Sequence, residues 1–215
     1  MLRETFIGRN PSHFVYNKFV EAFILSEVFL WSAWNFVTPI FGIFVVNNIK
    51  GGDIQIAAFA YSTYLIVRLV MEIIIGGYLN EKTDYQKLIM TSLGIIILSL
   101  GYVGFSFTSS ISFLFLFYVV LGIGMGLATP AKNSLFSTHL DKHKETTEWG
   151  IYDGITLLGI ALATALGGFI AGIYGFKPLF ILAFVINSIG VIPYLMILRR
   201  KAFPLPTPLR EEPEQ

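Results

Sequence analysis

The fold is decided by residues 54–87, which read IQIAAFAYSTYLIVRLVMEIIIGGYLNEKTDYQK. The first part, Ile54–Leu79, is apolar apart from a few polar residues and two charges, Arg68 and Glu72. It is longer than the roughly 20 helical residues that cross a hydrocarbon core of about 30 Å. It therefore predicts a membrane-spanning helix, and the polar stretch after it predicts a loop at the membrane surface.

Five other apolar stretches of spanning length occur in the chain. Hydrophobic residues make up 54% of its 215 residues and charged residues 13%, and the mean hydropathy is +0.68. These values are typical of a membrane protein with several spans. We expect six transmembrane helices, at about Phe19–Val46, Ile54–Leu79, Leu88–Phe107, Ile111–Phe136, Trp149–Tyr174 and Leu179–Leu198.

The six spans show signs of internal repetition. Three short motifs recur 91 positions later: Thr38-Pro39 as Thr129-Pro130, Tyr61 as Tyr152, and Gly76-Gly77 as Gly167-Gly168. Because three spans is an odd number, the second copy would enter the membrane inverted, as in many secondary transporters. We predict an all-α membrane protein of two inverted three-helix repeats, at about 19–107 and 111–198.

The orientation follows from the basic residues. Twelve lie in the N-terminal segment, the second and fourth connections and the C-terminal tail, two lie in other connections, and Arg68 lies inside a span. Lys132 is counted here in the fourth connection. The positive-inside rule predicts that both termini are cytoplasmic, with residues 1–18 as a cytoplasmic segment and 199–215 as a disordered tail. We expect an integral protein of the cytoplasmic (inner) membrane, in contact with membrane lipid and without nucleic-acid binding.

The loop after the second span resembles the loop motif of the major facilitator superfamily. It has a Gly, an acidic residue four positions later, and then basic residues. The resemblance implies a loop that stabilises a transport gate and contains Gly77, Glu81, Lys82, Asp84 and Lys87.

Span five is similar to the Gly-x-x-x-Gly-Pro-x-x-Gly-Gly signature of the same family, with Ala163-Thr164 in place of Gly-Pro. Small residues at this spacing let helices approach closely. We expect such packing at Gly159, Ala163, Gly167 and Gly168. The face formed by Gly159, Ala163 and Gly167 is also a candidate dimer seam.

Span four has the family's glycines followed by Pro130, whereas Tyr118 stands where many members have an arginine. Family members normally have twelve spans in two halves, and this chain has six. The resemblance therefore implies one half of a transporter for a small organic solute. It would be completed by a homodimer or by pairing with another half-transporter.

Three charged residues lie well inside the predicted spans: Glu27, Arg68 and Glu72. Charges at such depth are costly and indicate function. If spans one and two are neighbours, Arg68 could bridge both carboxylates, and the less well paired carboxylate could carry a proton in coupled transport. The alternative is a structural Arg68–Glu72 pair, with Glu27 facing a water-filled vestibule.

Trp31, Asn35 and Thr38 continue the Glu27 face at helical spacing. In family members the first and fourth spans of each half line the central cavity, so the resemblance implies that Glu27, Trp31, Asn35 and Thr38 contact substrate. Alternatively, Trp31 and Asn35 form a helix–helix contact. Trp34 points elsewhere and is expected to pack against lipid or a neighbour.

The sequence predicts no enzyme, cofactor or metal site. The glycines of span four are followed by no Gly-Lys-Ser/Thr, so they are not a nucleotide loop, and no serine elbow or zinc-protease motif occurs. His139 and His143 flank Asp141, which is a weak metal pattern, and we expect a solvated face there.

Two hypotheses follow. The first is a half-size facilitator-type transporter that acts as a dimer and is coupled to protons through Glu27 or Glu72. The alternative is a scaffold, chaperone or receptor that keeps the fold without transporting. A transporter should have a hydrated cavity that reaches Glu27 and Asn35, whereas a scaffold should enclose these residues by packing.

Overall fold

The computed structural model describes residues 18–142 and 144–199. The expected terminal segments therefore lie almost entirely outside the described residues. The long helices are α2 (Lys18–Val37), α4 (Ile54–Leu79), α5 (Asp84–Ser106), α6 (Ile111–His139), α7 (Glu145–Tyr174) and α8 (Phe176–Arg199), and α2 is continued by η2 (Thr38–Ile40) and α3 (Phe41–Asn48).

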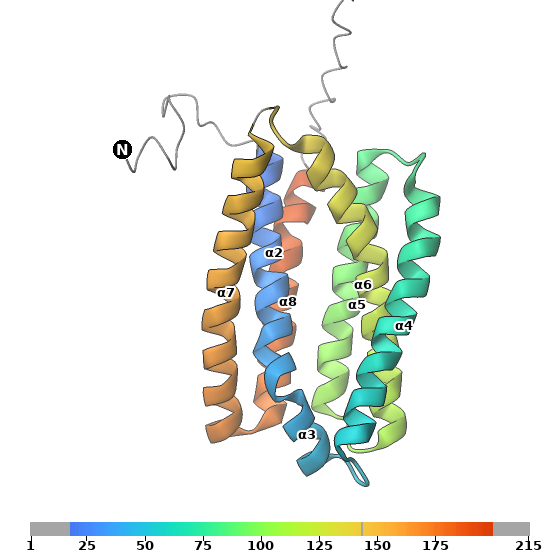
Figure 1. Cartoon of the computed structure of the whole chain (residues 1–215), viewed down its shortest axis with the longest axis vertical. Helices are drawn as coiled ribbons and strands as arrows, with labels where there is room; N and C mark the ends of the chain where they lie inside the picture. Colours follow the sequence, from blue (N-terminus) through green and yellow to red (C-terminus); the bar gives the residue numbers. More distant parts are fainter. Residues whose placement is uncertain (1–17, 143, 200–215) are drawn as a thin grey trace, which may run out of the picture.

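Six helical segments of the described chain are long and apolar enough to span a membrane, with Lys18–Asn48 as the first. The predicted all-α fold with six transmembrane helices is therefore confirmed. Successive long helices run in opposite directions (Figure 1). The start of α2 and the end of α8 lie at one end of the bundle, together with the α4–α5 and α6–α7 connections. We call this the terminal end, and the opposite end, which contains α3, the distal end.

Local sequence explains where the helices begin and end. Asp53 caps α4 by accepting a hydrogen bond from the Ile56 amide (2.7 Å), and Thr83 forms a capping box with Gln86 at the start of α5. Gly175 follows α7 with φ of 81°, a conformation that glycine adopts without steric cost. It allows the chain to turn at once into α8.

The two repeated Thr-Pro motifs differ in their effect on the backbone. Each threonine hydroxyl donates to a carbonyl four residues earlier, Thr38 to Trp34 (2.7 Å) and Thr129 to Met125 (2.8 Å). At Pro39 the α-helix gives way to η2, whereas α6 passes through Pro130 without a break. Proline removes one backbone donor in both places, but only the first motif ends an α-helix.

The packing has two halves. α2 packs against α7 and α8, α6 packs against α4 and α5, and α5 packs against α8. Exchanging α2 with α6, α4 with α7 and α5 with α8 leaves these five helix–helix contacts unchanged, whereas the contact between α7 and α8 has no counterpart of similar size between α4 and α5. The interior is rich in phenylalanine, whereas the outer helices α4 and α7 bury few residues.

Glycine pairs let the inner helices touch. A Cβ atom on Gly94 of α5 would lie 2.5 Å from the carbonyl oxygen of Gly124 on α6. The two backbones are therefore in direct contact, which is the use of small residues expected between membrane helices. This contact holds α5 and α6 tightly together.

Candidate functional site

A buried ion pair joins α2 and α6. Glu27 on α2 is fully buried, the Lys132 side chain on α6 is 3% exposed, and Lys132 Nζ donates to Glu27 Oε2. The residues are 105 positions apart in sequence. Because α2 and α6 belong to different packing groups, this pair spans the boundary between them.

Further contacts hold the Glu27 carboxylate. Its Oε2 accepts from Trp31 Nε1 (3.1 Å) and from the Tyr152 hydroxyl on α7 (3.4 Å), and Lys132 Nζ lies 5.5 Å from the centroid of the Trp31 ring. Its second oxygen, Oε1, is buried and has no hydrogen-bond partner among the described residues. One oxygen is thus saturated with donors, while the other is available for a proton or a water molecule.

Aromatic contacts close this site toward the terminal end. One helical turn beyond the ion pair, the rings of Phe23 and Phe136 stack with centroids 4.1 Å apart. One turn further, Phe19 stacks on His139 at 4.4 Å. The contact between α2 and α6 therefore continues from Glu27 toward the terminal end of the bundle.

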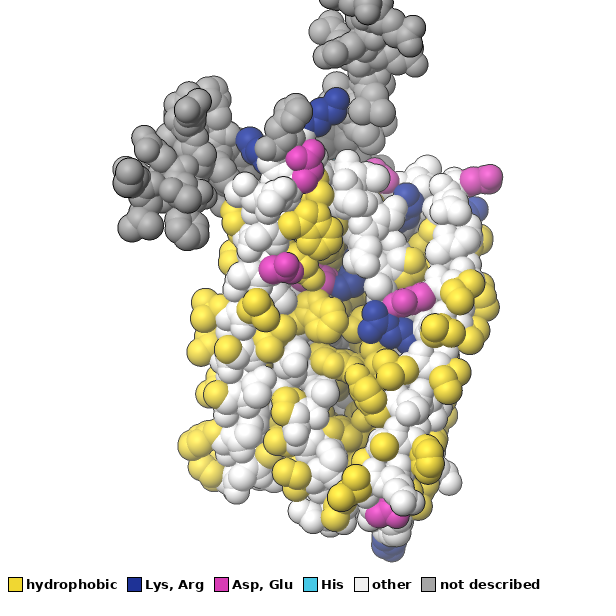
Figure 2. Space-filling view, viewed as in Figure 1, with side chains coloured by type: hydrophobic (Ala, Val, Ile, Leu, Met, Phe, Trp, Pro, Cys, Tyr) yellow, Lys and Arg dark blue, Asp and Glu magenta, His cyan; other side chains and the backbone are white. Residues whose placement is uncertain are grey.

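A second ion pair lies on α4. Arg68 Nε donates to Glu72 Oε1 (2.7 Å), and the side chains are 26% and 32% exposed. Arg68 Nη1 donates to the Tyr64 hydroxyl (3.2 Å). The pair lines an open groove of about 540 Å³ between α4 and α6, which also includes Asn133. Acidic and basic side chains gather at mid-height on this face of the bundle (Figure 2).

The three predicted charged residues do not form one network. Arg68 pairs with Glu72 on its own helix, and the cation opposite Glu27 is Lys132. Lys132 was assigned to a connection, but α6 extends to His139, so Lys132 lies about two turns inside the helix. One signal was available, because Lys132 falls within the apolar stretch predicted as span four.

The other predicted substrate contacts lie further along α2. Trp31 and Asn35 are half-buried and Thr38 is exposed. Asn35 Nδ2 donates to the Trp31 carbonyl (3.0 Å), and the Thr164 hydroxyl on α7 donates to the Asn35 carbonyl (3.4 Å). Glu27 and Trp31 are in direct contact, while Asn35 on α2 and Thr38 at the start of η2 donate to backbone carbonyls of α2. Substrate contact at these four residues stays a prediction.

Comparison with known proteins assigns the family. A family model described as Major Facilitator Superfamily matches residues 23–215. The chain belongs to the major facilitator superfamily. A comparison with curated proteins gives no match.

Among solved structures, this superfamily member is similar to the in meso crystal structure of the POT family transporter PepTSo. The TM-score is 0.68 and the identity 13%, over 94% of this chain and 40% of that one. At this identity the likeness shows the fold alone. The chain spans about 40% of the length of that transporter.

The loop that resembles the superfamily's gating motif connects α4 and α5. Gly77 lies in the last turn of α4, exposed Glu81 lies in the turn, and Lys82 Nζ sits 4.5 Å from the centroid of the Tyr78 ring. Two residues at the start of α5 reach α6: Lys87 donates to the Ser134 hydroxyl (2.9 Å), and Asp84 lies 3.6 Å from His139. The loop is therefore tied to the end of α6, whereas its gating role stays a prediction.

The small residues of α7 pack inside this superfamily bundle. A Cβ atom on Gly167 would lie 2.1 Å from the Phe36 carbonyl oxygen, and one on Gly159 would lie 2.9 Å from Val28. Ala163 between them is buried, whereas Gly168 faces open space. The dimer seam expected at Gly159, Ala163 and Gly167 is wrong, because α2 occupies that face.

Two other polar residues have defined places. His139 is buried against Phe19, so the solvated face expected there is wrong for His139, and His143 lies outside the described residues. Asn187 on α8 donates to the Ile95 carbonyl (3.0 Å) and the Ser99 hydroxyl (2.8 Å) on α5. This interaction links α8 to α5, the helices that join the two packing groups.

Proposed function

We propose that this superfamily member is a membrane transporter for a small organic solute and that Glu27 and Lys132 form its central site. The observation that carries the proposal is the buried ion pair between α2 and α6 in a six-helix bundle of this family. Removing two charges from water is costly, and apolar residues could close a helix contact at lower cost. Charged residues at such depth in a membrane protein are typically functional.

The same pair supports coupling to protons. Protonation of Glu27 would remove the negative charge that faces Lys132, and Lys132 would become an unpaired cation able to bind an acidic group of a solute. Glu27 is a better candidate than Glu72, because its Oε1 has no hydrogen-bond partner in the described chain, whereas Glu72 forms a partly exposed pair with Arg68. Loss of the proton would restore the ion pair and release the solute.

We further propose that the transporter needs a second six-helix unit, supplied by a second copy of this chain or by another half-transporter. Arg68 and Glu72 remain partly exposed in the middle of a span, and contact of charged groups with lipid is costly. A second unit on this face would shield them and enclose a shared cavity. A second unit would also correspond to the part of the similar transporter that this chain does not cover, since the match spans 40% of that transporter.

We propose that the protein lies in the cytoplasmic (inner) membrane and that both of its termini are in the cytoplasm. With Lys132 inside α6, eleven of the basic residues remain on the side of the termini against two on the other. The asymmetry still satisfies the positive-inside rule. The α4–α5 loop, for which we propose a gating role, then faces the cytoplasm.

A non-transporting scaffold or receptor is the second candidate. It is favoured by the complete burial of Glu27, since packing encloses this residue on the terminal side. In a transporter the enclosure would be one state of a cycle, and in a scaffold it would be permanent. Transport activity distinguishes the two.

The test uses purified protein in proteoliposomes. A mixture of amino acids, organic acids, sugars and organic cations is supplied outside, with and without an inward proton gradient, and the contents are analysed by mass spectrometry. We expect accumulation of at least one solute above protein-free liposomes, increased by the gradient. No accumulation in either condition would support the scaffold.

The second unit is tested by the mass of the protein in nanodiscs. A homodimer has twice the 24.0 kDa of one chain. A single copy that still transports would contradict the need for a second unit.

A further inference from the structure

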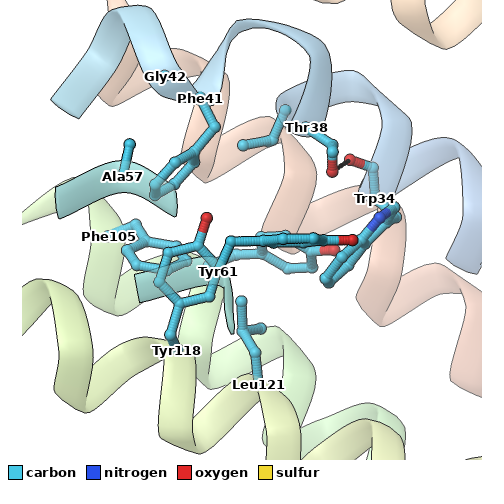
Figure 3. A pocket seen from close by; sticks show the side chains of 11 residues that line it. Trp34, Thr38, Phe41, Gly42, Ala57, Tyr61, Phe105, Tyr118 and Leu121 are labelled. Atoms are coloured by element: carbon cyan, nitrogen blue, oxygen red, sulfur yellow. Dashed lines mark hydrogen bonds between the residues drawn. The ribbon is translucent and has the colours of Figure 1, made fainter. Parts of the chain in front are cut away.

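A second cavity lies inside the bundle toward the distal end, between α2, α3, α4, α5 and α6. Its volume is about 230 Å³, and aromatic side chains form most of its wall: Trp34, Phe41, Tyr61, Tyr102, Phe105 and Tyr118 (Figure 3). Trp34 is seven residues after Glu27, which is roughly 10 Å along a helix. Neither Glu27 nor Lys132 lines the cavity, so it is distinct from the ion-pair site.

The wall is held in shape by contacts between its own rings. Tyr118 packs edge-on against Phe41 (centroids 5.1 Å apart) and Phe105 (5.2 Å), and these two phenylalanines meet at 4.9 Å. Such T-shaped pairs are a favourable arrangement of aromatic rings. The cavity is therefore formed before any ligand enters.

Two tyrosine hydroxyls belong to the wall of the cavity. The side chains of Tyr102 and Tyr118 are 3% and 5% exposed, and neither hydroxyl is among the enclosed polar atoms that lack a partner in the described part of the chain. Figure 3 shows Tyr118 extending from α6 into the space below Phe41 and Ala57. A phenolic hydroxyl can both donate and accept a hydrogen bond, so these two residues give the otherwise apolar wall groups that can bind a polar substituent of a ligand.

The lining of the cavity disfavours a charged ligand. None of the described residues that line the cavity is charged, and burying an ion without a counter-charge is strongly unfavourable. Tyr64, whose ring lies 4.8 Å from Trp34, accepts a hydrogen bond from Arg68. Arg68 is itself paired with Glu72, so this neighbouring charge is balanced and provides no counter-charge for an ion in the cavity.

We propose that this cavity binds a small uncharged aromatic molecule with one or two hydrogen-bonding groups, such as a phenol. An apolar cavity of about 150 Å³ is enough for benzene, so this one has room for a ring with substituents. The ring would stack against the aromatic wall, and its polar group would bind the hydroxyls of Tyr102 and Tyr118. The proposal does not depend on the ion-pair site.

The test is binding of 4-fluorophenol to the purified full-length protein in detergent, followed by ¹⁹F NMR. Excess unlabelled phenol separates specific binding from partition into micelles. Gly42→Leu fills the cavity from its rim, where an added Cβ meets nothing within 4 Å, so the variant should fold. Gly172→Leu on α7, also open at its Cβ, is the matched control.

We expect displaceable binding in the wild type and in Gly172→Leu, and at least a tenfold loss of affinity in Gly42→Leu. Tyr118→Phe, which keeps the ring and removes the hydroxyl, should weaken binding by roughly 3- to 10-fold, the effect of one hydrogen bond. Absence of displaceable binding, or equal binding by Gly42→Leu, would overturn the site. Displacement by tetramethylammonium would overturn the selection for an uncharged ligand, and unchanged binding by Tyr118→Phe would overturn the role of its hydroxyl.

Discussion

Two ion pairs deep in the bundle each join a glutamate to a basic side chain, but their surroundings are opposite. Glu27 and Lys132 come from different helices and are enclosed, whereas Arg68 and Glu72 lie one turn apart on α4 and border an open groove. The exposed pair is a local property of one helix. The enclosed pair exists only because the fold brings α2 and α6 together, and removing one of its charges leaves the other without water. The cost of removing one charge of an ion pair therefore depends on how deeply the pair is buried.

The largest expected effect comes from breaking the enclosed pair. Lys132→Ala leaves the Glu27 carboxylate buried without its cation, and the free energy of unfolding should fall by about 3–5 kcal/mol. Thermal unfolding of the protein in nanodiscs, followed by tryptophan fluorescence, measures the change.

The control removes both charges. Glu27→Gln with Lys132→Met leaves no unpaired ion, and it should recover most of the lost stability because uncharged replacements of a buried pair are often tolerated. If the double variant were as unstable as Lys132→Ala, loss of packing rather than an unpaired charge would explain the effect.

An intermediate effect is expected from the helix that brings Tyr152 to Glu27. Gly167→Ala places a Cβ against the Phe36 carbonyl and should lower the free energy of unfolding by about 1–3 kcal/mol, the usual cost of overpacking. Gly168→Ala, with open space at its Cβ, should be neutral or slightly stabilising. Equal stability of the two variants would show that α7 does not pack on α2 through Gly167.

The smallest effect should come from the exposed pair. In the proposed two-unit protein the groove beside Glu72 is part of a shared cavity that water can enter, so Arg68→Ala should change the free energy of unfolding by only about 0–1 kcal/mol. The same unfolding measurement applies. A loss as large as that of Lys132→Ala would mean that the two sites do not differ as their burial indicates.

The sequence was sufficient for the features that depend on local pattern. Apolar length predicted the six spans, and the i,i+4 spacing of Arg68 and Glu72 gave the exposed pair as one alternative. The packing of Gly159 and Gly167 was anticipated as close helix contact. In each case neighbouring residues on one helix carry the whole signal.

The features that depend on distant residues were not predictable in the same way. The partner of Glu27 lies 105 positions away, and counting Lys132 with the fourth connection hid it, although it falls inside the predicted span Ile111–Phe136. Which helix covers the glycine face of α7 depends on the packing of α2, and the aromatic cavity draws its wall from five helices. Periodicity identifies the face of a helix but does not identify its neighbour.

The most direct test of the central claim compares the two carboxylates in proton-driven uptake. Proteoliposomes containing wild type, Glu27→Gln or Glu72→Gln receive the solute that the wild type accumulates, under the same inward proton gradient. We expect Glu27→Gln to lose gradient-driven uptake and Glu72→Gln to retain most of it, with both proteins folded. Unchanged uptake by Glu27→Gln, or equal loss in both variants, would contradict the assignment of the enclosed pair as the coupling site.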